Sequence, residues 1–304
     1  MYMLFELAAI FLNVVLPVFG IVAIGYLLGP RLSLHAHTLS RVAYYVFVPA
    51  FVFQAISTSR VGLGNALIMI VYITVCHLVF AALGWIAGRL LKRSAEVTAA
   101  FMMIAIFGNV GNFGIPLIRF RLGDSALVPA TIYFVAIVIT AFIVCVGAAG
   151  WAKGGRSGAV WSIFKTPALW AAIPAFIVSD SGVELPLVLT RIVGLLADAM
   201  IPIMLMVLGL QLSEVRKLRI SGDVMIATGL RLLVAPAVAA VVAIPFGLSH
   251  VEYATGILQA GMPAAVLVSI IAIEHDVVPE FVTTTVFFST LLSLLTLTVL
   301  LTLI

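Results

Sequence analysis

The stretch Phe107-Gly-Asn-Val-Gly-Asn-Phe-Gly-Ile-Pro116 lies inside a long apolar run and decides how this chain folds. Glycines, two asparagines and a proline interrupt what would otherwise be a hydrophobic helix. In a helix interior, a glycine costs about 1 kcal/mol and a proline about 3 kcal/mol relative to alanine, and Pro116 lacks the N–H that would bond to residue 112. We therefore predict a helix that breaks between about Asn109 and Pro116 and restarts with Pro116 as its first residue.

A reduced copy of this pattern lies near the C-terminus, in Gln259-Ala-Gly-Met-Pro263. Gly114-Ile-Pro116 and Gly261-Met-Pro263 share the same Gly-x-Pro spacing, and each is followed by a proline at the start of the next apolar run, Pro129 and Pro279. We predict a second broken helix here. The two breaks are expected to meet near the middle of the membrane with antiparallel directions.

The composition places these helices in a lipid bilayer. The chain has 304 residues, of which 64% are hydrophobic and 9% are charged, and its mean hydropathy is +1.29. A soluble domain is nearer 45–50% apolar and about 25% charged. These values exclude a soluble enzyme and a nucleic-acid-binding module, because so apolar a chain could not keep a solvated surface. Cys76 and Cys145 lie in apolar runs and are expected to be buried hydrophobes.

Apolar runs bounded by charged or turn residues predict ten transmembrane helices in an all-α polytopic protein. They cover residues 5–29, 38–56, 65–90, 97–119, 125–152, 167–179, 186–213, 222–246, 251–274 and 279–304. We expect residues 1–152 to form one five-helix repeat, 153–166 a cytoplasmic linker, and 167–304 a second repeat. Because five is odd, the two repeats are inverted in the membrane, an arrangement typical of transporters.

The basic residues predict the orientation. Loops after odd-numbered helices hold Arg31, Arg89, Lys92, Arg93, Lys153, Arg156, Lys165, Arg216, Lys217 and Arg219, whereas loops after even-numbered helices hold only Arg60, Arg119 and Arg121. The odd loops are therefore expected on the cytoplasmic side. Both termini would then lie on the non-cytoplasmic side of the plasma (inner) membrane.

The two breaks predict an anion site. Unwound backbone at membrane depth is tolerated only against protein or a water-filled cavity. Each restarted helix carries about half a positive charge at its start, and two such starts facing one cavity favour a carboxylate. The predicted substrate-binding residues are Asn109, Gly111, Asn112, Gly114, Pro116, Gln259, Gly261, Met262 and Pro263. The alternative is that glycine and proline only kink these helices for packing.

These residues resemble a known family over essentially the whole chain. Asn109-Val-Gly-Asn-Phe-Gly-Ile-Pro116-Leu with Gly123, Ile201-Pro202 with Leu208-Gly-Leu-Gln-Leu, and Gln259-Ala-Gly-Met-Pro263-Ala look like the fourth, seventh and ninth helices of the auxin efflux carrier family. The plant carriers have a proline where this chain has Val110-Gly111, which argues against auxin itself.

The resemblance implies an inverted-repeat fold similar to bile-acid sodium symporters and sodium/proton antiporters. In such a fold, helices 1, 2, 6 and 7 form a scaffold against which a core of helices 3–5 and 8–10 moves. It also implies small organic anions as substrates, such as indole acetate in plants or malate and malonate in some bacteria. Asn112 would contact the carboxylate, and a dimer through the scaffold helices would fit.

Other polar residues in the predicted spans are candidates on position alone. Gln54 and Tyr45, together with Tyr44 and Asn13, could line the scaffold side of the site. Asp198 is the one acid deep in a span, and it either carries a coupling proton or is a structural partner of an arginine or a helix end. Arg231 is expected to snorkel to the interface or to pair with Asp198.

The remaining candidates stay open between a functional and a structural role. Arg119 and Arg121 either attract anions at the outer mouth or anchor the helix at the interface. His77 is expected to be a packed, hydrogen-bonded core residue, and the five histidines are too scattered to predict a metal cluster.

These features predict a secondary carrier that moves a small organic anion, a mono- or dicarboxylate, by alternating access. The alternatives are a channel or ligand sensor on a transporter fold, or an ion-coupled symporter of the bile-acid type. An enzyme is not expected, because the sequence has no His-Glu-x-x-His, no nucleotide-binding loop and no paired aspartates in its spans. The expected partners are the substrate, the bilayer and a second copy, with H⁺ or Na⁺ as candidate coupling ions and no other cofactor.

Overall fold

The computed structural model describes residues 2–58, 63–154, 167–214 and 218–304. Within these ranges the chain is helical apart from short connections and one isolated antiparallel bridge. The first half contains α1 (Tyr2–Ile10), η1 (Phe11–Val15), α2 (Leu16–Arg31), α3 (Ala36–Val42), η2 (Ala43–Phe47), α4 (Val48–Ser57), α5 (Leu63–Leu90), α6 (Ala95–Ile106), η3 (Val110–Gly114), α7 (Ile115–Leu122), η4 (Asp124–Ala126) and α8 (Leu127–Ala152).

The second half contains α10 (Pro167–Ser181), α11 (Leu187–Ser213), α12 (Gly222–Gly229), η5 (Leu230–Val234), α13 (Ala235–Ala243), η6 (Ile244–Phe246), α14 (His250–Ala260), α15 (Val266–Glu274) and α16 (Pro279–Leu303). In the described part of the chain, seven continuous helical stretches are long and apolar enough to cross a bilayer. They are Leu7–Arg31, Ala36–Ser57, Ala66–Leu90, Asp124–Ala152, Leu187–Ser213, Gly222–Phe246 and Pro279–Leu303. The protein is therefore a polytopic, all-helical membrane protein.

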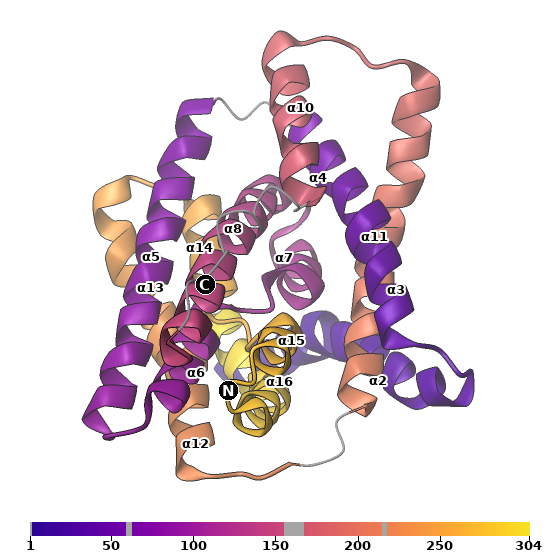
Figure 1. Ribbon diagram of the computed structural model, residues 1–304. Helices are drawn as coiled ribbons and strands as arrows, with labels where there is room; N and C mark the ends of the chain where they lie inside the picture. The colour runs from indigo at the N-terminus through magenta and orange to yellow at the C-terminus, as the bar shows by residue number, and fades with distance from the viewer. Residues whose placement is uncertain (1, 59–62, 155–166, 215–217) are drawn as a thin grey trace.

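Two groups of helices can be distinguished by how they pack (Figure 1). In the first, which we call the scaffold, α2 and α3 pack on α11, and α4 packs against α10 and α11. In the second, which we call the core, α5, α6 and α8 pack together, α7 and η4 pack on α8, α13 packs on α14, and α16 packs on α12 and α15. In Figure 1 the scaffold lies on the right, and α5, α6 and α13 of the core lie on the left.

Close backbone contact holds the scaffold helices α2 and α11 together. A Cβ atom added to Gly209 on α11 would collide with the carbonyl oxygen of Val22 on α2. Only glycine therefore allows the two backbones to approach this closely, which is how helices pack in a bilayer where lipid supplies no hydrophobic drive for association.

Both predicted breaks are present, but at different residues from those predicted. The first apolar helix, α6, ends at Ile106, and helix resumes as the π-helical turn η3 at Val110. Residues 111–116 are therefore helical, and Pro116 lies within the first two residues of α7 rather than at the point of restart. The second break runs from Gly261 to Ala265, and α15 begins at Val266, three residues after Pro263.

Ion pairs at the surface tie core elements to one another. Arg93 pairs with Asp223 at 2.9 Å and joins the α5–α6 connection to α12. Lys153, directly after α8, bonds to Glu96 at 2.8 Å and to Asp276 at 3.4 Å, and these bonds raise the pKa of Lys153. Each pair is solvent-exposed and contributes little by itself, but all of them lie within the core.

Some of the sequence predictions fall on residues outside the described ranges. Of the predicted linker 153–166, Lys153 and Gly154 are described and the rest is not. Arg60, Arg156, Lys165, Arg216 and Lys217, which contribute to the predicted orientation, also lie outside the described residues.

Candidate functional site: the crossing of two broken helices

The two interrupted segments cross and hydrogen-bond to each other. The backbone N–H of Asn109 donates to the carbonyl of Pro263 at 2.7 Å, and the N–H of Ala265 donates to the carbonyl of Phe107 at 2.9 Å. Gly108 and Ala264 face each other between these bonds as an antiparallel bridge. This pairing satisfies backbone groups that would otherwise be buried without partners.

A cavity of about 100 Å³ lies at this crossing, between core and scaffold. It is lined by Tyr44, Val48, Phe107, Gly108, Asn109, Val110, Gly111, Asn112, Phe134, Val138, Phe142, Met204, Ala265, Val266 and Leu267. Two helix starts therefore reach one small space, η3 through Gly111 and Asn112, and α15 through Val266 and Leu267.

The first turns of these two helices leave N–H groups without acceptors. In η3, the N–H of Val110 donates to Gly108 and that of Phe113 donates to Asn109. For the N–H groups of Gly111 and Asn112 between them, the described residues supply no backbone acceptor. Helix starts leave such donors in general, and each start carries about half a positive charge. The site is therefore suited to an anion.

The predicted site residues divide into two groups. Asn109, Gly111 and Asn112 line the crossing cavity. The other six predicted residues of the two broken helices do not line it: Gly114, Pro116, Gln259, Gly261, Met262 and Pro263.

Gln259 is buried against Gly114 instead. A Cβ atom added to Gly114 would collide with the Gln259 side-chain oxygen. Neither polar atom of the Gln259 side chain has a hydrogen-bond partner in the described structure, and the Nδ2 atom of Asn109 likewise has none. Buried amides without partners are rare, so these two side chains are polar groups held at the crossing at an energetic cost.

On the scaffold side, the two tyrosines named from the sequence lie in different surroundings. Tyr44 lines the crossing cavity, whereas Tyr45 is 58% exposed and contacts Tyr44 edge to face. Asn13 lines a separate pocket beside Arg121, away from the crossing. Gln54 lines another pocket, of about 240 Å³, together with Arg119, Asp124 and Asp198.

Asp198 and Arg231 do not form the predicted pair. Arg231 is completely buried and does not snorkel. Its guanidinium donates to the carbonyls of Ala105 at 2.8 Å, Met262 at 2.8 Å and Gln259 at 3.3 Å. Asp198 is exposed in the pocket with Gln54 and forms no ion pair within the described residues. Arg119 pairs with Asp124 at 2.9 Å.

Several residues at the crossing were not predicted from the sequence. Phe107, Phe134, Val138, Phe142 and Met204 form its apolar walls. A Cβ atom on Gly111 would approach the ring of Phe134 to 2.6 Å, so the ring closes over the start of η3. Apolar residues in a membrane span carry no signal that would distinguish a cavity wall from a lipid-facing position.

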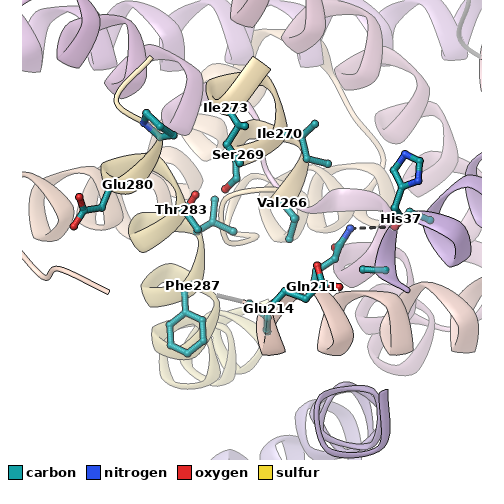
Figure 2. Close-up of a pocket in the computed structure, with 15 residues that line it drawn as sticks. His37, Gln211, Glu214, Val266, Ser269, Ile270, Ile273, Glu280, Thr283 and Phe287 are labelled. Atoms are coloured by element: carbon teal, nitrogen blue, oxygen red, sulfur yellow. Dashed lines mark hydrogen bonds between the residues drawn. The ribbon is translucent and has the colours of Figure 1, made fainter. Parts of the chain in front are cut away.

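A larger cavity of about 600 Å³ adjoins the crossing and shares Val266 with it (Figure 2). In Figure 2, His37 and Gln211 of the scaffold lie on one side, and Ser269 and Thr283 of the core lie on the other. The Gln211 amide donates to Ser40 at 3.2 Å within the scaffold wall.

His77 is a core residue, as predicted. It is fully buried, its Nδ1 lies 2.7 Å from the carbonyl of Ile73, and its ring packs on Phe80 and Tyr133. Cys76 and Cys145 are buried free thiols, also as predicted.

A helical membrane domain in which two broken helices cross at a small cavity is typical of membrane transporters. Comparison with known proteins agrees, because the family described as "Membrane transport protein" matches residues 10–154 and 157–301. The chain belongs to this family, which includes the auxin efflux carriers, and it is a transporter rather than an enzyme. The interruption between the matched stretches falls in the predicted linker.

Two named relatives match almost the whole chain, and a third matches part of it. An "Uncharacterized transporter" of Methanothermobacter thermautotrophicus is 30% identical over 292 residues, covering 93% of this chain and 95% of that protein. A "Putative malonate transporter" of Rhizobium meliloti is 28% identical over 307 residues, covering 96% and 95%. A "Probable auxin efflux carrier component 1b" of Oryza sativa subsp. japonica is 31% identical over 115 residues, covering 37% of this chain and 21% of that protein.

Proposed function

We propose that this protein is a secondary carrier for a small organic anion, a mono- or dicarboxylate, which binds at the crossing of the broken helices. The observation that carries the proposal is the convergence of two helix starts on one cavity, with unpartnered N–H groups at Gly111 and Asn112. Two starts of about half a positive charge each match one carboxylate. The name of the malonate-related protein from Rhizobium meliloti is in line with this class of substrate.

The transport cycle that we propose is alternating access by movement of the core along the scaffold. In this scheme the chain forms ten spans as two inverted five-helix repeats, 1–152 and 167–304, with the crossing as the shared centre. The placing of the 600 Å³ cavity between scaffold and core supports it, because such a cavity gives one face of the membrane a route to the crossing.

The predicted orientation assigns that face. The large cavity is bounded by the start of α3 and the end of α11. Both lie beside loops that the basic residues place in the cytoplasm, so we assign this conformation as open to the cytoplasm, with both termini on the outer side of the plasma membrane. We also propose that two copies of the chain form a homodimer through their scaffold helices.

Transport in proteoliposomes tests the function. We expect saturable flux of at least one acid from a panel that includes malonate, malate and indole acetate. Asn112→Ala should lower kcat/KM for that acid about tenfold or more, because a hydrogen bond to a charged group contributes about 1.5–3 kcal/mol. Uptake of radiolabelled acid under a pH gradient, a sodium gradient and no gradient is the measurement.

Asn13→Ala is the matched control, because Asn13 is also a membrane-segment asparagine but lies in a separate pocket. Normal transport by Asn112→Ala would mean that the site is misplaced. Absence of flux for every acid, from wild-type protein with a cooperative melting transition, would mean that the substrate is not a carboxylate.

A further inference from the structure

Arg231 is the one completely buried arginine among the described residues, and it sits where two helices end. It lies in the π-helical turn η5, and each part of its guanidinium has a different acceptor. Nη1 donates to Ala105 in the last turn of α6, Nη2 to Gln259 in the last turn of α14, and Nε to Met262 just beyond it. The guanidinium carbon also lies 5.8 Å from the centre of the Phe80 ring.

The positive charge of Arg231 is balanced by helix ends and not by a carboxylate. The described residues include no buried Asp or Glu, so Arg231 has no acidic partner in the interior. A helix C-terminus carries about half a negative charge, and α6 and α14 both end at the guanidinium. Two ends of about −0.5 each offset one charge of +1. An unpaired arginine would otherwise be very costly at this depth.

The crossing of two broken helices creates two C-terminal ends as well as two N-terminal starts. The starts, at η3 and α15, reach the cavity that we have proposed as the anion site. The ends need a positive charge of their own. We propose that Arg231 is a built-in cation that neutralises the two helix ends, so that anion transport requires no inorganic cation at the crossing. This inference rests on the proposed function for its consequence in transport, but not for its consequence in stability.

Gly108 provides the space for this cation. A Cβ atom on Gly108 would collide with Nη2 of Arg231 and would lie 2.9 Å from its central carbon. The guanidinium is fixed by three hydrogen bonds and cannot move aside without losing them. Gly108 in the break and Arg231 in a distant helix therefore form one unit. An arginine guanidinium is protonated at neutral pH, so this unit supplies a positive charge there.

Two measurements on the unaltered protein test the proposal first. The melting temperature in detergent and the initial rate of uptake are compared in sodium chloride and in equimolar choline chloride. We expect melting temperatures within about 2 °C of each other and rates within about twofold. A clear rise in both with sodium would overturn the proposal, because it would show an inorganic cation bound in addition to Arg231.

Variants then separate the charge from the hydrogen bonds. Arg231→Lys keeps a cation, whereas Arg231→Gln keeps donors but no charge. We expect Arg231→Lys to be the more stable by several degrees and to retain measurable uptake, while Arg231→Gln has none. In Arg231→Ala, about 10 mM guanidinium chloride should raise the melting temperature, by binding in the vacated space as a ligand stabilises any folded state, and should restore part of the uptake.

Arg93→Gln is the matched control, since it removes an exposed guanidinium from an ion pair within the core. Added guanidinium chloride should not change the melting temperature or the uptake of this variant. Equal stability of the lysine and glutamine variants, or no effect of guanidinium on a folded alanine variant, would overturn the proposal. If Arg231→Ala does not fold, the comparison of melting temperatures between Arg231→Lys and Arg231→Gln tests the proposal. If no acid is transported at all, the melting temperatures still decide, so failure of the carrier function and failure of the built-in cation are distinguishable.

Discussion

At the scale of single residues, Asn109 and Asn112 lie three positions apart and have different roles. The backbone of Asn109 organises the crossing: its N–H donates to Pro263, and its carbonyl accepts from Phe113 and Gly114. Its side-chain Nδ2 is buried and has no partner in the described structure. Asn112 is half-buried and lines the cavity. Under the proposed function, the Nδ2 group of Asn109 donates to the bound substrate.

This difference leads to a prediction for Asn109→Ala. The backbone bonds do not depend on the side chain, and the Nδ2 group that is removed has no hydrogen bond to lose. We expect the free energy of unfolding to change by less than about 1 kcal/mol, and KM for the acid to rise about tenfold. Thermal melting and uptake kinetics on the same preparation check this. A strongly destabilised variant would mean that the amide has a structural role instead.

At the scale of elements, proline explains the irregular helices. Each of the four π-helical turns in the described residues ends two residues before a proline: Pro17, Pro49, Pro116 and Pro236. In each, the residue before the proline donates five positions back, as Ile115 does to Val110. Proline has no N–H, and its ring clashes with the carbonyl four positions back. A widened turn relieves that clash, and such turns are frequent at functional sites.

This mechanism sets how far the sequence could predict the structure. Hydropathy placed every apolar segment on helix to within a few residues, because the length of a span is fixed by the bilayer. The exact residues of the first break could not be predicted, because the π-helical turn η3 accommodates Pro116 while the backbone stays helical. Tyr44 and Tyr45 could not be told apart from the sequence, because both lie in the π-helical turn η2, where ordinary helical periodicity fails. Arg231 was misjudged because its partners are backbone carbonyls up to 126 positions away, which no side-chain pattern reveals.

Pro116→Ala tests the role of this turn. Alanine restores an N–H that can bond to the carbonyl of Asn112, which favours an ordinary α-helical turn and rotates Asn112 relative to the cavity. We expect uptake to fall severalfold while the melting temperature is kept or raised, because alanine favours helix. Pro17→Ala is the control, since it alters the π-helical turn η1, which does not line the crossing. Unchanged uptake by Pro116→Ala would show that the geometry of η3 does not set the site.

At the scale of the whole molecule, the ion pairs in the described part of the chain lie within the core and do not join the core to the scaffold. The ion pairs of the described residues, Arg93–Asp223, Arg119–Asp124 and Lys153 with Glu96 and Asp276, all join core elements to core elements. The Gln211–Ser40 bond joins scaffold to scaffold. Between the two groups, three cavities and apolar contacts such as Phe19 on Phe113 are found, and the described residues form no ion pair there. A boundary of this kind allows one body to slide along the other without breaking charged contacts.

Cross-linking tests whether that sliding is required for transport. His37 on α3 and Thr283 on α16 lie on opposite walls of the 600 Å³ cavity (Figure 2). In a background with Cys76 and Cys145 replaced, the pair His37→Cys and Thr283→Cys is bridged with a cleavable bifunctional thiol reagent. We expect uptake to be abolished by the bridge and restored when it is cleaved. The same bridge between Arg93→Cys and Asp223→Cys, which joins two core elements, should leave uptake intact. Full transport by the bridged 37–283 protein would contradict this cycle. It would show that transport proceeds while the distance across the cavity is held fixed, so that the cavity need not close.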